Sequence, residues 1–169
     1  DFYGRFSTDL SRKNIDLSAV FGYSGGGDIY NYDRSMYDSD GAYVNYNQMN
    51  LKEGWNRWEK PGDIATHPKA EYGNKSQSSK GSSRYLEDAS YLRLRSLTLG
   101  YTLPWKIQYV DNIRLSFSGE NLFVLSGFSG VDPELPAEVG NKYKAGSVGV
   151  AISPYPQARK FMFGLNVTS

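Results

Sequence analysis

Five segments of this 169-residue chain alternate between apolar residues and small or polar ones. In the last segment, RKFMFGLNVTS at residues 159–169, Phe161, Phe163, Leu165 and Val167 fall on one side. A period of two is the signature of a β-strand with one apolar face. The apolar sides of the other four segments are Phe2, Phe6 and Leu10; Ile15, Leu17, Ala19, Phe21 and Tyr23; Leu97, Leu99, Tyr101 and Leu103; and Ile113, Leu115 and Phe117. The pattern therefore predicts an all-β fold, and no segment shows a convincing helical period.

The connections between these segments differ sharply in length. Residues 11–14 and 104–112 are short, whereas residues 24–90 and 124–158 are long. Compact soluble domains rarely contain structureless connections of this length. Outer-membrane barrels combine short periplasmic turns with long extracellular loops, and their strands have roughly 9 to 11 residues. We therefore expect an antiparallel up-and-down meander whose two short turns lie at the periplasmic end.

Composition narrows the class of protein further. The sides opposite the apolar residues are mostly Gly, Ser, Thr and Asn, which suits the lumen of a barrel better than the charged surface of a soluble sandwich. The mean hydropathy of −0.56 is compatible with a barrel, because only every second strand residue is apolar. The net charge of +1 gives no general attraction to nucleic acid, and the absence of Cys excludes disulfides and Cys-based metal sites. No pattern of catalytic residues or cofactor ligands is present, so we expect neither an enzyme nor a cofactor.

Three ordered stretches resemble one known family. They are SSRYLEDASYLRLRSLTLGYTLP, which begins at residue 82; LSFSGENLFVLSGFSGVDPE at residues 115–134; and SPYPQARKFMFGLNVTS at residues 153–169. They are similar to the C-terminal barrel region of SusC/RagA-like TonB-dependent outer-membrane transporters of Bacteroidetes. The opening strand-turn-strand segment is also similar, so the resemblance spans nearly the whole chain. One departure is Ser169, because the family usually ends on an aromatic residue; either the ending is a variant or further residues follow.

The resemblance implies a role that the composition does not show. Family members are long chains with a plug domain inside a barrel of about 22 strands. Each works with a SusD-like surface lipoprotein as a lid, imports oligosaccharides or peptides, and is energised by TonB through a segment near its N-terminus. Residues 1–169 would then be a C-terminal part of the barrel, with about five strands and two long extracellular loops. The plug and the earlier strands would belong to the remainder of the same transporter.

Several loop residues are candidates for binding. Trp55, Arg57, Trp58 and Asp63 lie in WNRWEKPGD and would offer a stacking platform with polar groups for a substrate or for the lid. The alternative is that they pack the loop onto itself. Four acidic residues could supply oxygens to Ca²⁺, but their spacing matches no metal loop and favours solvated carboxylates: Asp28, Asp33, Asp38 and Asp40. The single histidine, His67, is expected to be an ordinary loop residue.

Three arginines share the parity of the apolar residues. Arg93 and Arg95 are in phase with Leu97, Leu99 and Tyr101, and Arg159 is in phase with Phe161. If those apolar residues face lipid, all three arginines would form a band at the outer rim and bind lipid phosphates. The alternative is a β-bulge near residues 95–96 that turns Arg93 and Arg95 into the lumen.

The sequence thus favours part of an outer-membrane importer, with lipid-facing residues Phe161, Phe163, Leu165, Val167, Leu97, Leu99 and Tyr101. A secreted β-sandwich that binds glycans through exposed aromatic residues is the alternative. Aromatic loops suit sugars and peptides alike, so the substrate stays open.

Overall fold

The computed structural model of the chain describes residues 2–46, 49–105, 108–134, 150–151 and 156–168. The chain divides into two compact units. The sheet unit consists of residues 1–27, 88–128 and 155–169, and the loop unit consists of residues 28–87 and 129–154. Among the residues that the structure describes, no helix is long and apolar enough to cross a membrane.

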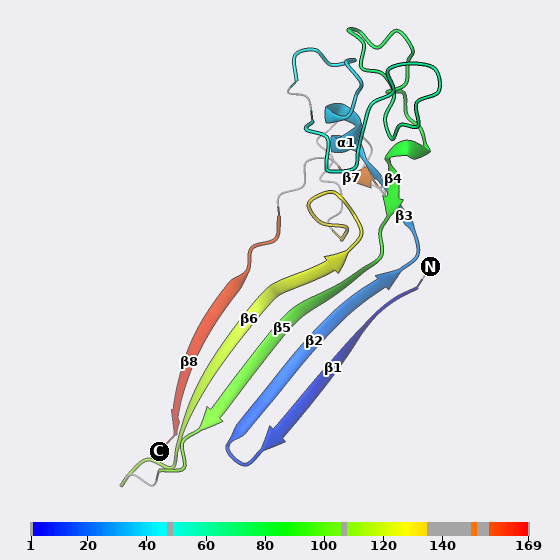
Figure 1. Ribbon diagram of the computed structural model, residues 1–169. Coiled ribbons are helices and arrows are strands. Elements are labelled where there is room, and N and C mark those ends of the chain that lie inside the picture. Colours follow the sequence, from blue (N-terminus) through cyan, green and yellow to red (C-terminus); the bar gives the residue numbers. More distant parts are fainter. Residues whose placement is uncertain (1, 47–48, 106–107, 135–149, 152–155, 169) are drawn as a thin grey trace. The chain divides into compact units, whose positions relative to one another are not determined.

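The sheet unit is built on one five-stranded antiparallel sheet, as the alternating pattern predicts (Figure 1). The strands lie side by side in the order β1-β2-β5-β6-β8, so each strand pairs with the next strand of the unit along the chain. Their bounds are β1 Phe2–Arg12, β2 Ile15–Gly25, β5 Tyr91–Thr102, β6 Asn112–Ser126 and β8 Lys160–Thr168.

The register puts both short connections at the same end of the sheet. Arg12 pairs with Ile15, and Asn112 pairs with Thr168, close to the turns. At the opposite end, Ser24 pairs with Tyr91, next to the point where the chain leaves the sheet for residues 26–90. The predicted arrangement of short and long connections is confirmed, while the assignment of the short turns to the periplasm stays a prediction.

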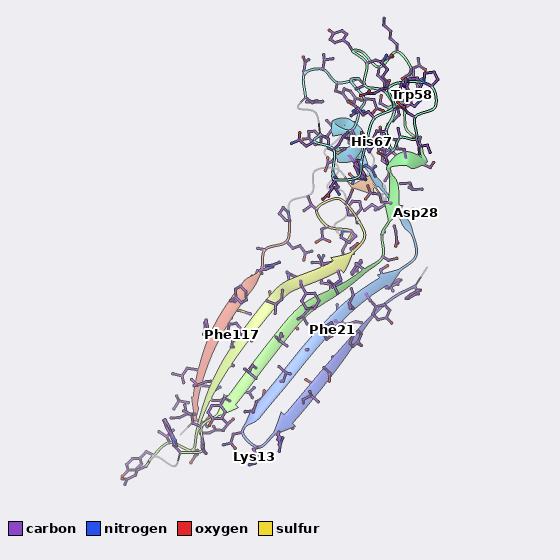
Figure 2. All side chains as sticks on the ribbon, in the orientation of Figure 1. Lys13, Phe21, Asp28, Trp58, His67 and Phe117 are labelled. Atoms are coloured by element: carbon purple, nitrogen blue, oxygen red, sulfur yellow. The ribbon has the colours of Figure 1, made fainter. Side chains whose placement is uncertain are left out.

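One face of the sheet, called here the aromatic face, collects apolar side chains from every strand, among them Phe21 and Phe117, which are labelled in Figure 2. Residues that pair directly across antiparallel strands share a face. Two rows of pairs cross this face: Phe6, Phe21, Leu94 and Phe123 in one, and Leu10, Leu17, Leu99, Phe117 and Phe163 in the other. The Phe6 and Phe21 rings stack with centroids 4.8 Å apart, and the Phe117 and Phe163 centroids are 5.0 Å apart. The side chains therefore form a continuous apolar surface.

The aromatic face is open in the structure. Phe163 is 85% exposed and Leu165 is 67% exposed, and the other predicted lipid-facing residues on β8 and most of those on β5 are also exposed: Phe161, Val167, Leu99 and Tyr101. Leu97 lies on the same face and is partly buried. The inner face of a β-sandwich would be covered by a second sheet about 10 Å away. The described residues of the sheet unit form only one sheet, which disfavours the sandwich alternative.

The opposite side, called the polar face, is crossed by an ion pair. An Asp16 carboxylate oxygen on β2 lies 2.5 Å from a guanidinium nitrogen of Arg114 on β6. The pair passes over Gly100 on the intervening strand β5, where a Cβ would lie 2.5 Å from the Asp16 carboxylate. Glycine at this position therefore leaves room for the ion pair between β2 and β6 to pass over β5. Beside them, the Thr98 and Ser118 hydroxyls are 3.2 Å apart.

A β-bulge in β5 corrects the prediction for Arg93 and Arg95. The pairing of β5 with β2 shifts between Ser96 and Leu94, which leaves Arg95 as an extra residue. Leu94 then pairs with Phe21 on the aromatic face, whereas Arg93 pairs with Gly22 on the polar face. The guanidinium of Arg95 also lies over Gly22, where a Cβ would be 2.4 Å from its Nε. The prediction that both arginines share the face of Leu97 is therefore wrong, and the bulge alternative is correct.

The loop unit contains short elements that the sequence pattern did not indicate. They are β3 Asp28–Asn31, α1 Tyr32–Tyr37, a 3₁₀ turn η1 Ser83–Tyr85, β4 Leu86–Asp88 and β7 Val150–Ala151. A second, three-stranded sheet has the order β4-β3-β7. Helix α1 begins after Asn31, whose side chain accepts a hydrogen bond of 3.0 Å from the Arg34 amide. The long connections therefore fold into local structure of their own.

Candidate functional site

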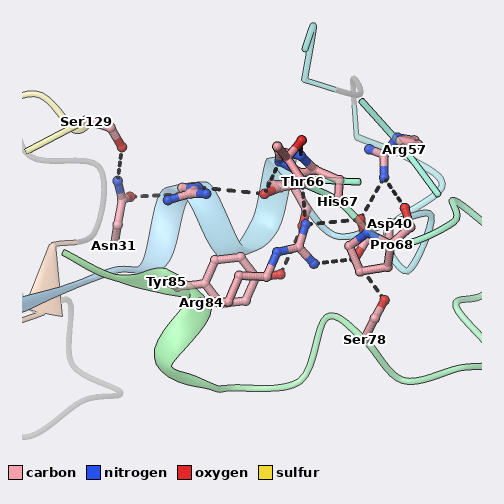
Figure 3. A network of polar contacts seen from close by, with 12 residues as sticks. Asn31, Asp40, Arg57, Thr66, His67, Pro68, Ser78, Arg84, Tyr85 and Ser129 are labelled. Atoms are coloured by element: carbon pink, nitrogen blue, oxygen red, sulfur yellow. Dashed lines mark hydrogen bonds and ion pairs between the residues drawn. The ribbon is translucent and has the colours of Figure 1, made fainter. Parts of the chain in front are cut away.

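A buried cluster of charged side chains organises the loop unit (Figure 3). Asp38 and Asp40 follow α1 and are 0% and 1% exposed. Arg84 bridges them: one guanidinium nitrogen is 2.8 Å from Asp38 Oδ1 and 3.2 Å from Asp40 Oδ1, and the other contacts Asp40 Oδ2. A planar guanidinium suits this arrangement because its donors form a fixed fork. Buried carboxylates are stable only when such partners compensate for the lost water.

Asp40 also has partners from two other segments. Arg57 donates a hydrogen bond of 2.7 Å to Asp40 Oδ1 and one of 3.1 Å to the carbonyl oxygen of Pro68. The Ser78 hydroxyl lies 2.8 Å from Asp40 Oδ2. The Asp40 carboxylate therefore joins residues that are 17, 38 and 44 positions away in the sequence.

His67 fills the space between this cluster and Trp55. It is 4% exposed, its Nε2 lies 3.3 Å from Asp38 Oδ2, and the Thr66 hydroxyl is 2.8 Å from its Nδ1. The Trp55 and His67 ring centroids are 4.7 Å apart. The cations of Arg34 and Lys52 lie 5.4 Å and 5.3 Å from the centroid of the Trp55 ring, in the range of cation–π contacts.

Burial and charge shift the pKa values of the cluster. Burial alone would raise the pKa of Asp40, but hydrogen bonds from Arg84, Arg57 and Ser78 together hold it below its ordinary value. Burial lowers the pKa of His67 below its ordinary value; the Asp38 carboxylate opposes this shift, and the positive charges of Arg84, Arg57 and Arg34 add to it. Burial raises the pKa of Tyr85 to about 12, and its hydroxyl donates a hydrogen bond of 2.9 Å to the Asp38 carbonyl oxygen. At neutral pH the cluster thus holds ionised Asp40, neutral His67 and neutral Tyr85.

These positions correct two expectations. Asp38 and Asp40 are buried rather than solvated, and Arg84 supplies a positive charge to both. In the part of the chain that the structure describes, no group of three or more acidic or histidine side chains is arranged to hold a metal. His67, expected to be an ordinary loop residue, is part of the buried cluster.

A second set of polar contacts joins Ser129 to the earlier part of the loop unit, residues 28–87. Glu87 Oε1 accepts hydrogen bonds from Arg34 at 3.0 Å and from the Ser129 hydroxyl at 2.8 Å, and its Oε2 accepts one of 2.7 Å from the Ser129 amide. Asn31 donates to the Ser129 hydroxyl at 3.1 Å. Segments that are far apart in the sequence are therefore held together by directed hydrogen bonds.

The four loop candidates have different environments. Trp55 and Arg57 belong to the buried cluster, and Asp63 Oδ2 accepts hydrogen bonds from the amides of Glu59 and Lys60 in a local turn. Trp58 is 37% exposed and borders a groove of about 310 Å³. The structure thus joins Trp55 and Arg57 and leaves Trp58 as the one of the four that lines this groove. Arg159, the third predicted rim arginine, is exposed immediately before β8.

Comparisons with known proteins agree on one group. No family model matches the chain. The chain is 32% identical over 171 residues to TonB-dependent receptor P3 of Formosa agariphila, which covers 99% of this chain and 16% of that receptor. It is 31% identical over 87 residues to TonB-dependent receptor SusC of Bacteroides thetaiotaomicron, covering 49% of this chain and 8% of SusC. The chain thus spans about one sixth of the length of the first of these relatives.

Solved structures show the same relationship. The chain superposes on part of the RagAB peptide importer in its closed-closed state with a TM-score of 0.76 and 27% identity, over 98% of this chain and 17% of that one. For the open-open state the TM-score is 0.74 and the identity is 25%. Together with the antiparallel sheet and its exposed aromatic face, these similarities show that the chain belongs to the SusC/RagA-like TonB-dependent transporters.

Proposed function

We propose that this chain forms a C-terminal part of the barrel wall of an outer-membrane TonB-dependent importer. Strands from the remainder of the same transporter would pair with the outer edges of β1 and β8 and close the barrel around a plug domain. Closure is needed because an open sheet edge in lipid leaves backbone hydrogen-bonding groups unsatisfied. The proposal is supported by the match of the chain to about one sixth of the length of TonB-dependent receptors.

The observation that carries the proposal is the exposed aromatic face. Its side chains come from all five strands and lie opposite a face made mostly of small, polar and charged residues. An alternation of apolar and polar faces is what a barrel wall needs between lipid and an aqueous lumen. In this role the predicted lipid-facing residues contact acyl chains, and Arg93, Arg95 and the Asp16–Arg114 pair line the interior.

The whole transporter would act with several partners. A SusD-like lipoprotein would serve as the lid, TonB would supply energy through the N-terminal region, and outer-membrane lipid of a Bacteroidetes-type cell would surround the barrel. The substrates would be oligosaccharides or peptides, and the chain would contribute wall and outer loops without a catalytic role. Similarity to SusC and to a structure of the RagAB peptide importer supports this set of partners.

The loop unit would lie on the extracellular side and contact the substrate or the lid. Trp58 is the residue best placed for such a contact because it is exposed, whereas the Trp55 ring contacts the ring of buried His67 at a tilt of 41°. Replacing Trp58 by Ala and measuring both substrate uptake and lid association tests this role. Unchanged values for both would leave Trp58 as a residue that packs the loop.

Arg159 would reach lipid phosphates at the outer rim. It is exposed and lies two residues before Phe161, which is on the aromatic face. Because Arg93 and Arg95 lie on the opposite face, this contact would involve Arg159 without them.

The direct test of the wall compares two arginine substitutions on β8 in the full transporter. Phe163→Arg places a charge on the aromatic face, and Asn166→Arg places the same charge on the polar face. A lipid-facing arginine near the bilayer midplane costs about 2–4 kcal/mol, whereas a lumenal one faces water. We expect Phe163→Arg to reduce the amount of folded transporter in the outer membrane and Asn166→Arg to leave it near the wild-type amount. Equal effects would contradict the proposed orientation.

A further inference from the structure

A groove crosses the aromatic face of the sheet and spans β5, β6 and β8. It has a volume of about 430 Å³. Phe117, which is labelled in Figure 2, contributes to it from β6, the middle strand of the three. Two rows of side chains wall the groove: Leu99, Phe117 and Phe163 on the side away from the short turns, and Tyr101, Leu115 and Leu165 on the side toward them. The groove therefore offers an apolar ligand hydrocarbon contacts on both sides.

The floor of the groove is formed by Ser116 and Gly164. These two residues pair with each other between the two rows, at positions whose side chains belong to the polar face. A Cβ at Gly164 would lie 2.4 Å from Ser116 Oγ, which places the serine hydroxyl on the polar face. Neither residue therefore puts a side chain into the groove. Because rows on one face repeat at every second residue, they are about 6.6 Å apart along the strands, which leaves room between them for one hydrocarbon chain.

The two walls distinguish the groove from a flat apolar surface. Between acyl chains and apolar side chains in a membrane there is no hydrophobic driving force, because lipid tails are as apolar as leucine. An acyl chain is held instead by van der Waals contacts, which are individually weak and collectively large. A chain in the groove contacts the floor and both walls, whereas a chain on a flat surface is contacted from one side. The groove can thus hold one acyl chain more tightly than a flat surface can.

The position of the groove along the strands selects one leaflet of the membrane. The wall residues range from Tyr101, one position before the end of β5 at Thr102, to Phe163, five positions before the end of β8 at Thr168. At a strand tilt near 45° each residue gains about 2.3 Å of height, so the groove lies about 2–12 Å above the short-turn end of an apolar band that is about 25 Å tall. With the loop unit on the extracellular side, as proposed, the groove lies in the periplasmic half of the membrane.

We infer that the groove is a binding site for one acyl chain of a glycerophospholipid from the periplasmic leaflet. In an outer membrane this leaflet consists of glycerophospholipids, whereas lipid A occupies the outer leaflet. Tyr101, on the wall nearer the short turns, has an amphipathic side chain that suits the boundary between acyl chains and headgroups. The inference rests on the proposed function, because it requires the aromatic face to lie against lipid. It deepens that function by assigning one bound molecule to one site on the wall.

The first test counts the lipids that stay on the full transporter after gentle extraction from the outer membrane. Native mass spectrometry gives the mass of each retained molecule and so separates glycerophospholipids from lipid A. We expect Leu115→Trp, whose larger side chain fills the groove, to retain one glycerophospholipid fewer than wild type. Leu10→Trp is the matched control, because Leu10 lies on the aromatic face of β1, outside the groove, and this variant should retain the wild-type number.

The second test measures where and how tightly the chain binds. The full transporter in detergent micelles is titrated with a phosphatidylethanolamine that carries a photoreactive diazirine in one acyl chain, and the cross-linked peptides are identified after illumination. We expect saturable cross-links to the peptides of β6 and β8 that contain Leu115 and Leu165. Leu165→Ala removes part of one wall without adding bulk, and the loss of about ten atom–atom contacts should weaken binding about tenfold. Leu10→Ala is its control and should leave the half-saturation concentration unchanged.

Four results would overturn the inference. Lipid A could be the molecule that Leu115→Trp loses, or Leu115→Trp and Leu10→Trp could retain equal numbers of glycerophospholipids. The photoreactive lipid could label β1 as strongly as β6 and β8 without saturation, or a protein partner could be the molecule that only Leu115→Trp releases. If any of these occurs while Phe163→Arg lowers the amount of folded transporter and Asn166→Arg does not, the inference fails and the proposed function stands. Equal effects of those two arginine variants contradict the proposed function itself.

Discussion

Arg93 and Leu97 lie on the same strand, four positions apart, and project from opposite faces of the sheet. Leu97 pairs with Ala19 on the aromatic face, and Arg93 pairs with Gly22 on the polar face. The change of face occurs at Arg95, which the pairing of both neighbouring strands skips. On β6, Asn121 has a φ of +53° beside the same irregularity. Because of the bulge, Leu92 and Leu94 lie on the aromatic face, and Arg93 and Arg95 both lie on the polar face.

Gly22 makes room for the bulge, so a side chain there should destabilise the sheet. In Gly22→Val the new Cβ would meet the Arg95 guanidinium, and we expect a loss of about 1 kcal/mol, at the low end of overpacking, because the end of the Arg95 side chain can shift. The measurement is the urea midpoint of the folded full transporter in lipid vesicles. Ser18→Val, on the same strand and face, is the control and should change stability by no more than about 0.5 kcal/mol. Equal midpoints for the two variants would contradict the close approach of Arg95 to Gly22.

Arg84 should be the main stabilising residue of the loop unit. Arg84→Met leaves the buried carboxylates of Asp38 and Asp40 without their shared partner, and removing one member of a buried ion pair costs about 3–5 kcal/mol. Hydrogen exchange of the Trp58 and Tyr85 amides should accelerate accordingly, while amides in β2 and β5 should exchange as in wild type.

Lys69→Met is the control for that experiment. Lys69 also belongs to an ion pair, but its side chain is 57% exposed, and exposed pairs contribute about 0–1 kcal/mol. If Arg84→Met and Lys69→Met accelerate exchange equally, the buried cluster does not stabilise the unit in the way proposed.

The loop unit should lose stability on mild acidification through His67. The pKa of His67 is lower in the folded chain than the ordinary 6.5, so the unfolded state binds the proton more readily. The stabilisation of the loop unit by neutral His67 is complete above about pH 6.5. It decreases as the pH falls toward the pKa of His67 in the folded chain, by at most about 1.4 kcal/mol per pH unit. Hydrogen exchange of loop-unit amides between pH 7 and pH 5, corrected for the intrinsic exchange rate, measures the slope of loop-unit stability against pH.

His67→Gln should flatten that slope, since His67 is the only histidine of the chain. Asp40 does not interfere, because its pKa lies below 3.8 and its own contribution is lost only at more acidic pH. A slope that persists unchanged in His67→Gln would contradict the assignment.

The sheet could be predicted from the sequence because its determinants are local. Alternation fixes which side chains of β8 share a face, and the length of a connection separates tight turns from long excursions. The face of Arg93 could not be predicted, because the bulge depends on pairing with two neighbouring strands, and a shift of one residue exchanges the faces. Strict alternation therefore gives the correct face for Leu97, Leu99 and Tyr101, which follow the bulge. It gives the wrong face for Arg93, which precedes the bulge.

The buried cluster of the loop unit could not be predicted from the sequence for a different reason. Arg84 lies 46 positions from Asp38 and 44 from Asp40, so no local pattern links them. Helix α1 has six residues, fewer than two turns, which is too short to show a period. Its one local signal is the N-cap residue Asn31 with Asp33 in the first turn. The pair Trp55 and Trp58 did mark the right segment, but which ring is buried depends on the distant partner His67.

The orientation of β8 in the membrane tests the account most directly. Single cysteines at residues 161–167 of a cysteine-free full transporter, each labelled with a small fluorophore in lipid vesicles, can be quenched either by nitroxide-labelled lipid or by water-soluble acrylamide. We predict strong lipid quenching at positions 161, 163, 165 and 167 and strong acrylamide quenching at 162, 164 and 166, because the two sets project from opposite faces of the sheet. Equal quenching at both sets of positions, or the reverse pattern, would contradict the assignment of the aromatic face to lipid.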